Sequence, residues 1–194
     1  MTINAGKTTV FGTDRARAGG HDPVIQGAAL AGDGTVWPTG LVLSRTAGRT
    51  FQPYGEHVVK IGDGDAAEKD FAAVLGRVEP GSVEIGDGAE TFADNGMGTL
   101  TGSAGGTGTI NYATGQLAVS FNAAPGDGVD VNATCTHAPA GVLDVETDTA
   151  SSSSGVVIVH GSVNKALLKV GVATPAAAPD TLVQQLEDLG IYPV

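Results

Sequence analysis

The chain is poor in cysteine, in aromatic residues and in charge. Cys135 is the single cysteine among 194 residues, which excludes an intrachain disulfide framework and is compatible with assembly in a reducing cytoplasm. Aromatic residues make up 5% of the chain and charged residues 16%. Such a small aromatic content disfavours a carbohydrate-processing cleft, because those clefts present aromatic platforms to the sugar.

Long apolar runs are missing as well. Residues 1–7 lack the apolar stretch of a signal peptide, and the longest apolar runs are far shorter than the roughly 20 residues that cross a bilayer. We therefore expect no membrane partner.

Positive charge is scarce, with 10 basic residues against 21 acidic ones and a net charge of −11. An acidic chain repels phosphate backbones, so direct binding to nucleic acid is not expected. The balance is uneven along the chain. Residues 1–31 carry three basic residues against two acidic ones, whereas residues 76–141 carry one against seven. The first segment can meet an acidic partner, and the second is typical of a surface that faces solvent.

Glycine is abundant, with 30 residues, and favours short strands joined by turns over a helical bundle. The clearest hairpin joins residues 107–112 to residues 116–121, where apolar side chains alternate on both sides of Gly115. Gly115 supplies the positive φ that a short turn needs. Alternation at residues 41–44, 57–61 and 129–135 predicts further strands, whereas residues 71–75 fit a strand or a short helix.

The last segment predicts a helix over residues 180–189. Thr181 with Gln184 three residues later has the spacing of a capping box, and Asp180 is an alternative cap. Leu182, Leu186 and Leu189 lie on one helical face, and Gly190 is the expected C-terminal cap. The expected fold class is therefore mainly β, with this one helix at the C-terminus.

The order of elements after residue 155 is the most specific feature of the sequence. A Val-rich strand ends at His160-Gly161, a short apolar segment follows at residues 162–168, and the capped helix precedes Ile191-Tyr-Pro-Val194. This order resembles the C-terminal half of lambda-type bacteriophage head decoration proteins. The resemblance implies a small β-barrel or β-sandwich-like core that forms a homotrimer on the outer surface of the mature capsid and stabilises it against DNA pressure. Its partner is then the major capsid protein, its location the virion, and its place of assembly the host cytoplasm.

This resemblance predicts four parts. Residues 1–31 form a flexible capsid-binding arm, residues 32–75 and 140–194 form the decoration core, and residues 76–139 form an inserted antiparallel β module. The arm is either disordered until it meets a partner or simply a mobile tail. The expected capsid contacts are Ile3, Val10, Phe11, Arg15 and Arg17. The expected core or trimer contacts are Trp37, Leu41, Val157, Val159, Leu182, Leu186 and Leu189.

No cluster of residues indicates a particular reaction, so we expect neither an enzyme nor a cofactor. The histidines have no metal-ligand spacing, and Cys135 reads as a small core residue on a strand. Glycine-flanked aspartates fit turns better than calcium ligands, since a calcium loop requires a distal Glu. They are Asp63, Asp65, Asp87, Asp94 and Asp127.

Two other functions remain open. The module around residues 107–121 fits a tail or baseplate β-domain equally well. A receptor- or glycan-binding module displayed on the virion, with host-surface contact through residues 76–139, is the second alternative.

Overall fold

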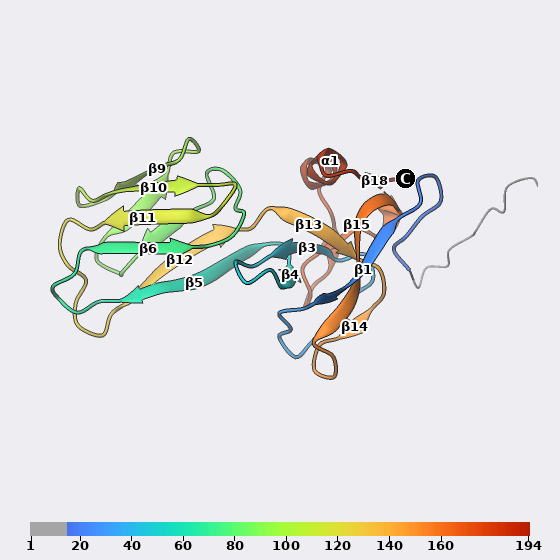
Figure 1. Ribbon diagram of the computed structural model, residues 1–194, viewed down its shortest axis with the longest axis horizontal. Coiled ribbons are helices and arrows are strands. Elements are labelled where there is room, and N and C mark those ends of the chain that lie inside the picture. Colours follow the sequence, from blue (N-terminus) through green and yellow to red (C-terminus); the bar gives the residue numbers. More distant parts are fainter. Residues whose placement is uncertain (1–14) are drawn as a thin grey trace, which may run out of the picture. The chain divides into compact units, whose positions relative to one another are not determined.

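The computed structural model describes residues 15–194, and it is mainly β, with 47% of residues in strands and 7% in helices (Figure 1). The expected fold class is confirmed. Ile3, Val10 and Phe11 of the predicted arm lie outside the described residues.

The chain forms two compact units, each discontinuous in sequence. Unit 1 contains the described residues up to Ser44, Thr50–Tyr54 and Pro139–Val194, and unit 2 contains Arg45–Arg49 and Gly55–Ala138. The predicted insertion began at residue 76, and its amino-terminal boundary is corrected to residue 55. The reason is that strands β5 (Glu56–Asp63) and β6 (Asp70–Val74) pair with strands of unit 2. The drop in charge at residue 76 therefore marks no boundary.

Unit 1 is built on a sheet with the order β1-β15-β13-β3-β4, in which β18 also pairs with β15. Leu30, directly after β1, forms a bridge with Phe51 of β4, so the ends of the sheet meet and the sheet curls. Its strands are β1 (Val24–Ala29), β3 (Val42–Arg45), β4 (Phe51–Pro53), β13 (Pro139–Leu143), β15 (Ser154–Val163) and β18 (Ile191–Pro193). Two short pairs complete the unit, β2 (Val36–Trp37) with β14 (Thr147–Asp148) and β16 (Lys169–Val170) with β17 (Ala176–Ala177).

Both faces of this sheet are buried, which explains its continuous apolar runs. Side chains of successive strand residues point to opposite faces. Val142 and Ile158 accordingly belong to the hydrophobic cluster beneath helix α1, whereas Leu143 and Val157 belong to the cluster that contains Trp37. An apolar run with no alternation is the pattern expected of a strand covered on two sides.

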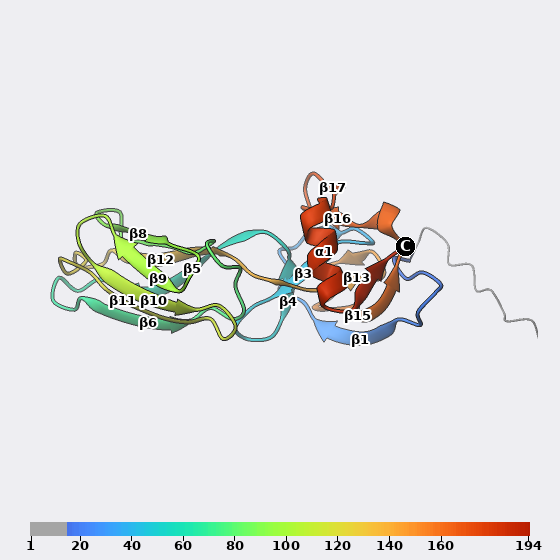
Figure 2. The same ribbon diagram turned by 90° about the horizontal axis from the view of Figure 1, so that it is seen from above.

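Helix α1 (Asp180–Asp188) crosses β13 and buries Leu182, Val183 and Leu186 (Figure 2). The predicted side-chain cap is wrong. Pro179 occupies the N-cap position, and no side chain of the described residues caps the helix there. Gly190 has φ +80° and ends the helix as expected. Since the first turn lacks a cap, packing of the apolar face holds the helix in place. The short 3₁₀ helix η1 (Lys165–Leu167) is capped by the Asn164 side chain.

The predicted arm is too long. Residues 15–31 belong to the fold of unit 1, because β1 pairs with β15 over six residues and Arg17 bridges Val163. Ala16 is fully buried in the cluster beneath α1. Sequence reasoning missed this because Gly19, Gly20 and Gly27 dilute the apolar pattern, while most of the burial comes from β15.

Unit 2 is a nearly closed, barrel-like sheet of eight antiparallel strands with the order β5-β12-β7-β8-β9-β10-β11-β6. Residues 71–75, left open between strand and helix, lie mostly in strand β6. The remaining strands are β7 (Glu84–Gly86), β8 (Thr91–Asp94), β9 (Thr99–Gly102), β10 (Thr107–Asn111), β11 (Gln116–Ser120) and β12 (Asp130–Thr136). Phe71 on β6 packs against Gly62 of β5, where a Cβ would overlap the ring. A side chain thus covers the seam between the end strands.

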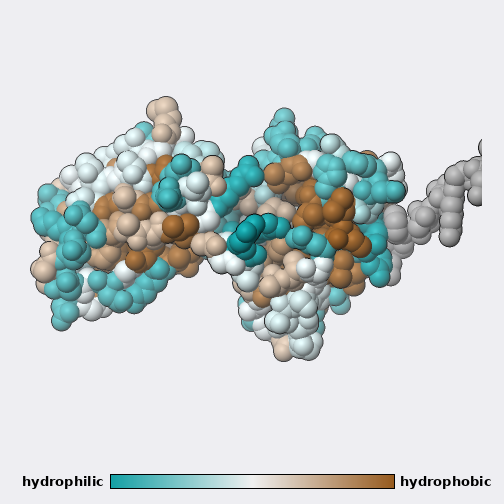
Figure 3. Space-filling model, viewed as in Figure 1, coloured by the Kyte–Doolittle hydropathy of each residue, from teal (hydrophilic) through white to brown (hydrophobic). Residues whose placement is uncertain are grey.

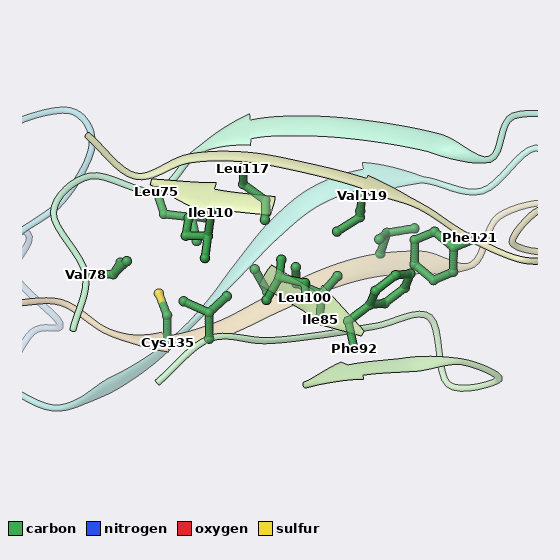
Figure 4. Close-up of a cluster of buried hydrophobic side chains, with 13 residues drawn as sticks. Leu75, Val78, Ile85, Phe92, Leu100, Ile110, Leu117, Val119, Phe121 and Cys135 are labelled. Carbon is green, nitrogen blue, oxygen red and sulfur yellow. The ribbon is translucent and has the colours of Figure 1, made fainter. Parts of the chain in front are cut away.

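Inward-facing residues of every second position fill this barrel (Figure 4). Phe92 and Phe121 meet edge to face, with ring centroids 4.8 Å apart, and Phe71 stacks on Phe121 in the same way. Cys135 is buried in the same cluster, as expected of a small core residue. The alternation read from the sequence therefore identified the core side of these strands correctly.

The predicted hairpin is present as β10 and β11, with Asn111 paired to Gln116 and Gly115 at φ +72°. A Cβ at Gly115 would overlap the backbone of Gly76. Gly88 has a similar φ of +86° but no described atom within 4 Å of the same position. Alanine at Gly88 adds backbone strain alone, whereas alanine at Gly115 adds both backbone strain and steric overlap. Comparing the two substitutions therefore distinguishes the two costs.

We expect Gly88→Ala to lower the free energy of unfolding by about 1–2 kcal/mol, the cost of a left-handed alanine. Gly115→Ala should lose about 1–3 kcal/mol more, because the neighbouring backbone must move. Urea unfolding of both variants measures the difference. Equal losses of stability in the two variants would show that the Gly76 backbone moves aside without a measurable loss of free energy.

Candidate interaction surfaces

The most strongly held group of unit 1 is the carboxylate of Asp144, which is completely buried at the end of β13. It accepts hydrogen bonds from the Arg17 backbone N–H at 3.1 Å and from Arg17 Nε at 2.9 Å, and it pairs with Arg17 Nη2. Arg15 Nη1 donates to the same carboxylate at 3.1 Å. The Asp144 carbonyl oxygen accepts from the Ala16 N–H at 2.9 Å. One residue thus fixes the position of three consecutive residues.

The electrostatics of this pair favour the ionised state. Burial by itself raises the pKa of Asp144, but hydrogen bonds and charge from Arg17, with a further bond from Arg15, outweigh burial and hold the pKa below its ordinary value. The hydrogen bond to Asp144 raises the pKa of Arg17 in turn. A buried carboxylate with this many donors is compensated for the loss of water.

This geometry corrects the expected role of the two arginines. Only 16% of the Arg17 side chain is exposed, and its guanidinium is committed to Asp144. Arg15 is 43% exposed but shares the same acceptor. Both residues hold the start of the fold, and they do not extend from it as a free basic arm.

The residues predicted for core or trimer packing fall into two groups. Five are buried within unit 1 and belong to its own core, and two are partly exposed, namely Val159 and Leu189. The five buried ones are Trp37, Leu41, Val157, Leu182 and Leu186. They stabilise the subunit itself and offer no surface to a neighbour.

Three ring side chains that sequence reasoning did not bring together gather at one end of β15. The His21 and His160 rings lie 4.9 Å apart, and Tyr192 lies 5.7 Å from His21 and 6.0 Å from His160. Ser162 fixes the loop, because its Oγ accepts from the His21 N–H and its own N–H donates to the His21 carbonyl. Only the tertiary structure joins residues so distant in sequence.

Exposed apolar side chains continue this region onto β1. Val24 pairs with His160 in register and is 53% exposed, and Ile25 is 40% exposed. Figure 3 shows hydrophobic surface gathered over β1 and β15. We call His21, Val24, Ile25, His160 and Tyr192 the β1 patch.

Unit 2 has a shallow groove of about 380 Å³ on the outer face of β6, β11 and β10. Its floor contains Ala72, Gly108 and Ala118, and Figure 3 shows apolar surface over β6 and β11. A more polar hollow of about 560 Å³ on the faces of β12, β7 and β8 contains Glu56, Glu84 and Asp94.

Two of the glycine-flanked aspartates, Asp65 and Asp87, hold turns. Asp65 accepts from the N–H groups of Ala67 and Glu68, and Asp87 accepts from those of Ala89 and Glu90. Asp63 pairs instead with Lys60. Within residues 15–194, no group of three or more His, Cys, Asp or Glu side chains is placed to hold a metal ion.

Glu90 departs from the expectation that the acidic residues of this region face solvent. It is buried, and its carboxylate accepts from the N–H groups of Gly106 at 2.7 Å and Asn122 at 2.8 Å, with Ala104 at 3.2 Å. The acid therefore joins two loops of unit 2. Its place after the Asp87-Gly88 turn gave no sequence signal for this role.

Two further titratable groups lie in the core of unit 2. Burial raises the pKa of Cys135 to about 11, with a smaller contribution from Glu56, so the thiol stays protonated and unreactive. His137 Nε2 lies 2.7 Å from the Leu75 carbonyl oxygen. Since a carbonyl oxygen only accepts, the neutral ring carries its proton on Nε2.

No family model matches this chain, and neither the curated proteins nor the solved structures contain a match to it. Among residues 15–194, no helix has both the length and the apolar character needed to cross a membrane.

We expect Arg17→Met to lower the stability of unit 1 by about 3 kcal/mol, because it leaves a buried carboxylate with Arg15 as its remaining side-chain donor. The control is Lys60→Met. Lys60 pairs with Asp63 and Asp130 at the surface, where water and salt screen such pairs, so its loss should cost much less. Denaturant unfolding compares the two. Similar small losses would show that the Asp144 pair contributes little.

His137 predicts a pH dependence of unit 2. Burial lowers its pKa, and the hydrogen bond to Leu75 only partly opposes this. The unfolded chain then binds more protons than the folded one below about pH 6.5, so stability should fall as the pH drops from about 7.5 to 5.5. His137→Gln keeps an N–H donor but does not titrate, and should flatten this dependence in urea unfolding. An unchanged slope would assign the dependence to other groups.

Proposed function

We propose that this chain is a structural protein of a tailed bacteriophage head, which binds the outer surface of the mature capsid as a homotrimer and stabilises it against the pressure of packaged DNA. The proposal rests first on the resemblance of residues 155–194 to lambda-type decoration proteins. In the structure this stretch contributes β15, η1, α1 and β18, all within unit 1. Its partner is the major capsid protein, and it acts on the virion after assembly in the host cytoplasm.

The anchor at Asp144 is the structural observation that supports this function most directly. It gives residues 1–14 a fixed origin on unit 1, since Arg15 and Arg17 are held there. Ile3, Val10 and Phe11 are the capsid contacts that we propose within this segment. Arg15 and Arg17 leave that set, because Asp144 already engages them.

Weak contacts are sufficient for such a function. A strand added to a capsid edge gains backbone hydrogen bonds worth about 0.5–1.5 kcal/mol each. A trimer carries three such segments, and binding of the first raises the effective concentration of the others. This adhesion depends on protein contacts alone, so it does not require the acidic chain to bind nucleic acid.

Host-surface contact by unit 2 is the alternative, and the groove over β6, β10 and β11 is the observation that favours it. Thr107, Thr109 and Ser120 line this groove together with Asp70. Hydroxyl and carboxylate groups around an apolar floor are compatible with a polar ligand.

The test of the decoration function is binding to purified empty shells, both expanded and unexpanded. We expect the full chain to bind expanded shells, and the chain without residues 1–14 to bind at least about 100-fold more weakly, because avidity is lost. The deletion stops before Arg15, so unit 1 keeps its anchor, and circular dichroism verifies the fold. Equal binding of both proteins to both shells would contradict the proposed role of residues 1–14.

A further inference from the structure

Strand β1 is an edge strand without the usual protection. It pairs with β15 on one side. On its other side the described residues make one bridge, from Leu30 just after β1 to Phe51 of β4, and no strand pairs there with Val24–Ala29. Natural edge strands avoid association by carrying charged residues, proline or bulges. The segment Val24–Ala29 has no charged residue and no proline, and its one irregularity lies at its first step, between Val24 and Ile25. Its outward backbone groups are therefore open to another chain.

The β1 patch adds side chains to this open edge. Val24 is 53% exposed, and Tyr192 is 41% exposed on β18. The ring centroids of His21 and His160 lie 5.7 and 6.0 Å from that of Tyr192, and His160 is the strand partner of Val24. Exposed side chains of β1, β15 and β18 contribute to this region, and Figure 3 shows hydrophobic surface over β1 and β15. Such continuous patches mark association sites on soluble proteins.

Charge indicates which partner fits. With a net charge of −11, copies of this chain repel one another over most of their surface. A surface on which copies meet must therefore be poor in carboxylates. Asp22 is the one charged residue from His21 to Ala29, and the patch itself contains only apolar, phenolic and imidazole groups. The β1 patch can therefore contact the same patch of another copy without bringing like charges together.

We propose that copies of this chain associate through the β1 patch, with Val24, Ile25 and Tyr192 as the central contacts. This inference rests on the self-association in the proposed function and names its surface. In a trimer the same residues of all three copies meet only at the three-fold axis, so the β1 patch would lie there. Backbone pairing at the open edge of β1 would require a different edge strand of the neighbouring copy, because β1 paired with β1 closes a two-fold dimer.

Engineered thiols test the contact directly, because the native Cys135 is buried and its raised pKa keeps it from reacting. Val24→Cys, mildly oxidised, should give covalent dimers on a denaturing gel. The matched control is Val58→Cys, since Val58 is 67% exposed on β5, an end strand of unit 2. It should stay monomeric on the gel. Cross-linking that is equal in both variants, or absent from Val24→Cys, would overturn the proposal.

Native mass spectrometry and sedimentation provide the second measurement. The unmodified protein should form one defined oligomer, and Ile25→Asp should shift it to the monomer, because each copy would bring a charge into the contact. Val74→Asp, at a valine on β6 that is 57% exposed against 40% for Ile25, should leave the oligomer intact. A monomer at every concentration, or an oligomer that Ile25→Asp does not alter, would refute the proposed surface. These measurements use no capsid shells. A failure of the protein to bind shells would therefore not change their result.

Discussion

The buried carboxylate of Asp144 is the interaction on which the arrangement of unit 1 depends. It lies at the end of β13, yet it binds the segment around Arg17 that precedes β1. Because a buried charge without a partner costs several kcal/mol, the chain cannot release this segment cheaply. The same carboxylate holds Arg15 and Arg17, and so fixes the point from which the described chain runs to β1. The subunit core, the open edge and the proposed capsid contacts therefore share one anchor.

Unit 2 is inserted in the sequence of unit 1, and each unit has a hydrophobic core of its own. Unit 1 buries side chains on both faces of its sheet, one cluster beneath α1 and one around Trp37, and exposes apolar side chains at β1 and β18. Unit 2 is filled by its own inward-facing residues and needs no second layer. Its outer faces remain available, and the groove over β6 and β11 is one of them. Each unit can therefore change its surface without disturbing the other unit's core.

Much of the fold was predictable from local pattern. The hairpin around Gly115, the apolar face of α1 and the burial of Cys135 all follow from alternation or helical spacing. The boundary at residue 55 was not predictable, because β5 and β6 alternate as a core strand of either unit would. The cap expected from Thr181 also failed, since Pro179 takes that position. Spacing shows which face is apolar but not which neighbour covers it.

The sequence by itself determined the strand class, the turns and the inward side of most strands, because these depend on residues a few positions apart. It also carried the resemblance in residues 155–194 on which the proposed function rests. Only the tertiary structure decided that Arg17 meets Asp144, 127 residues later, and that His21 meets Tyr192. Pairings of this kind depend on how distant strands register on one sheet, and register is set by the whole core.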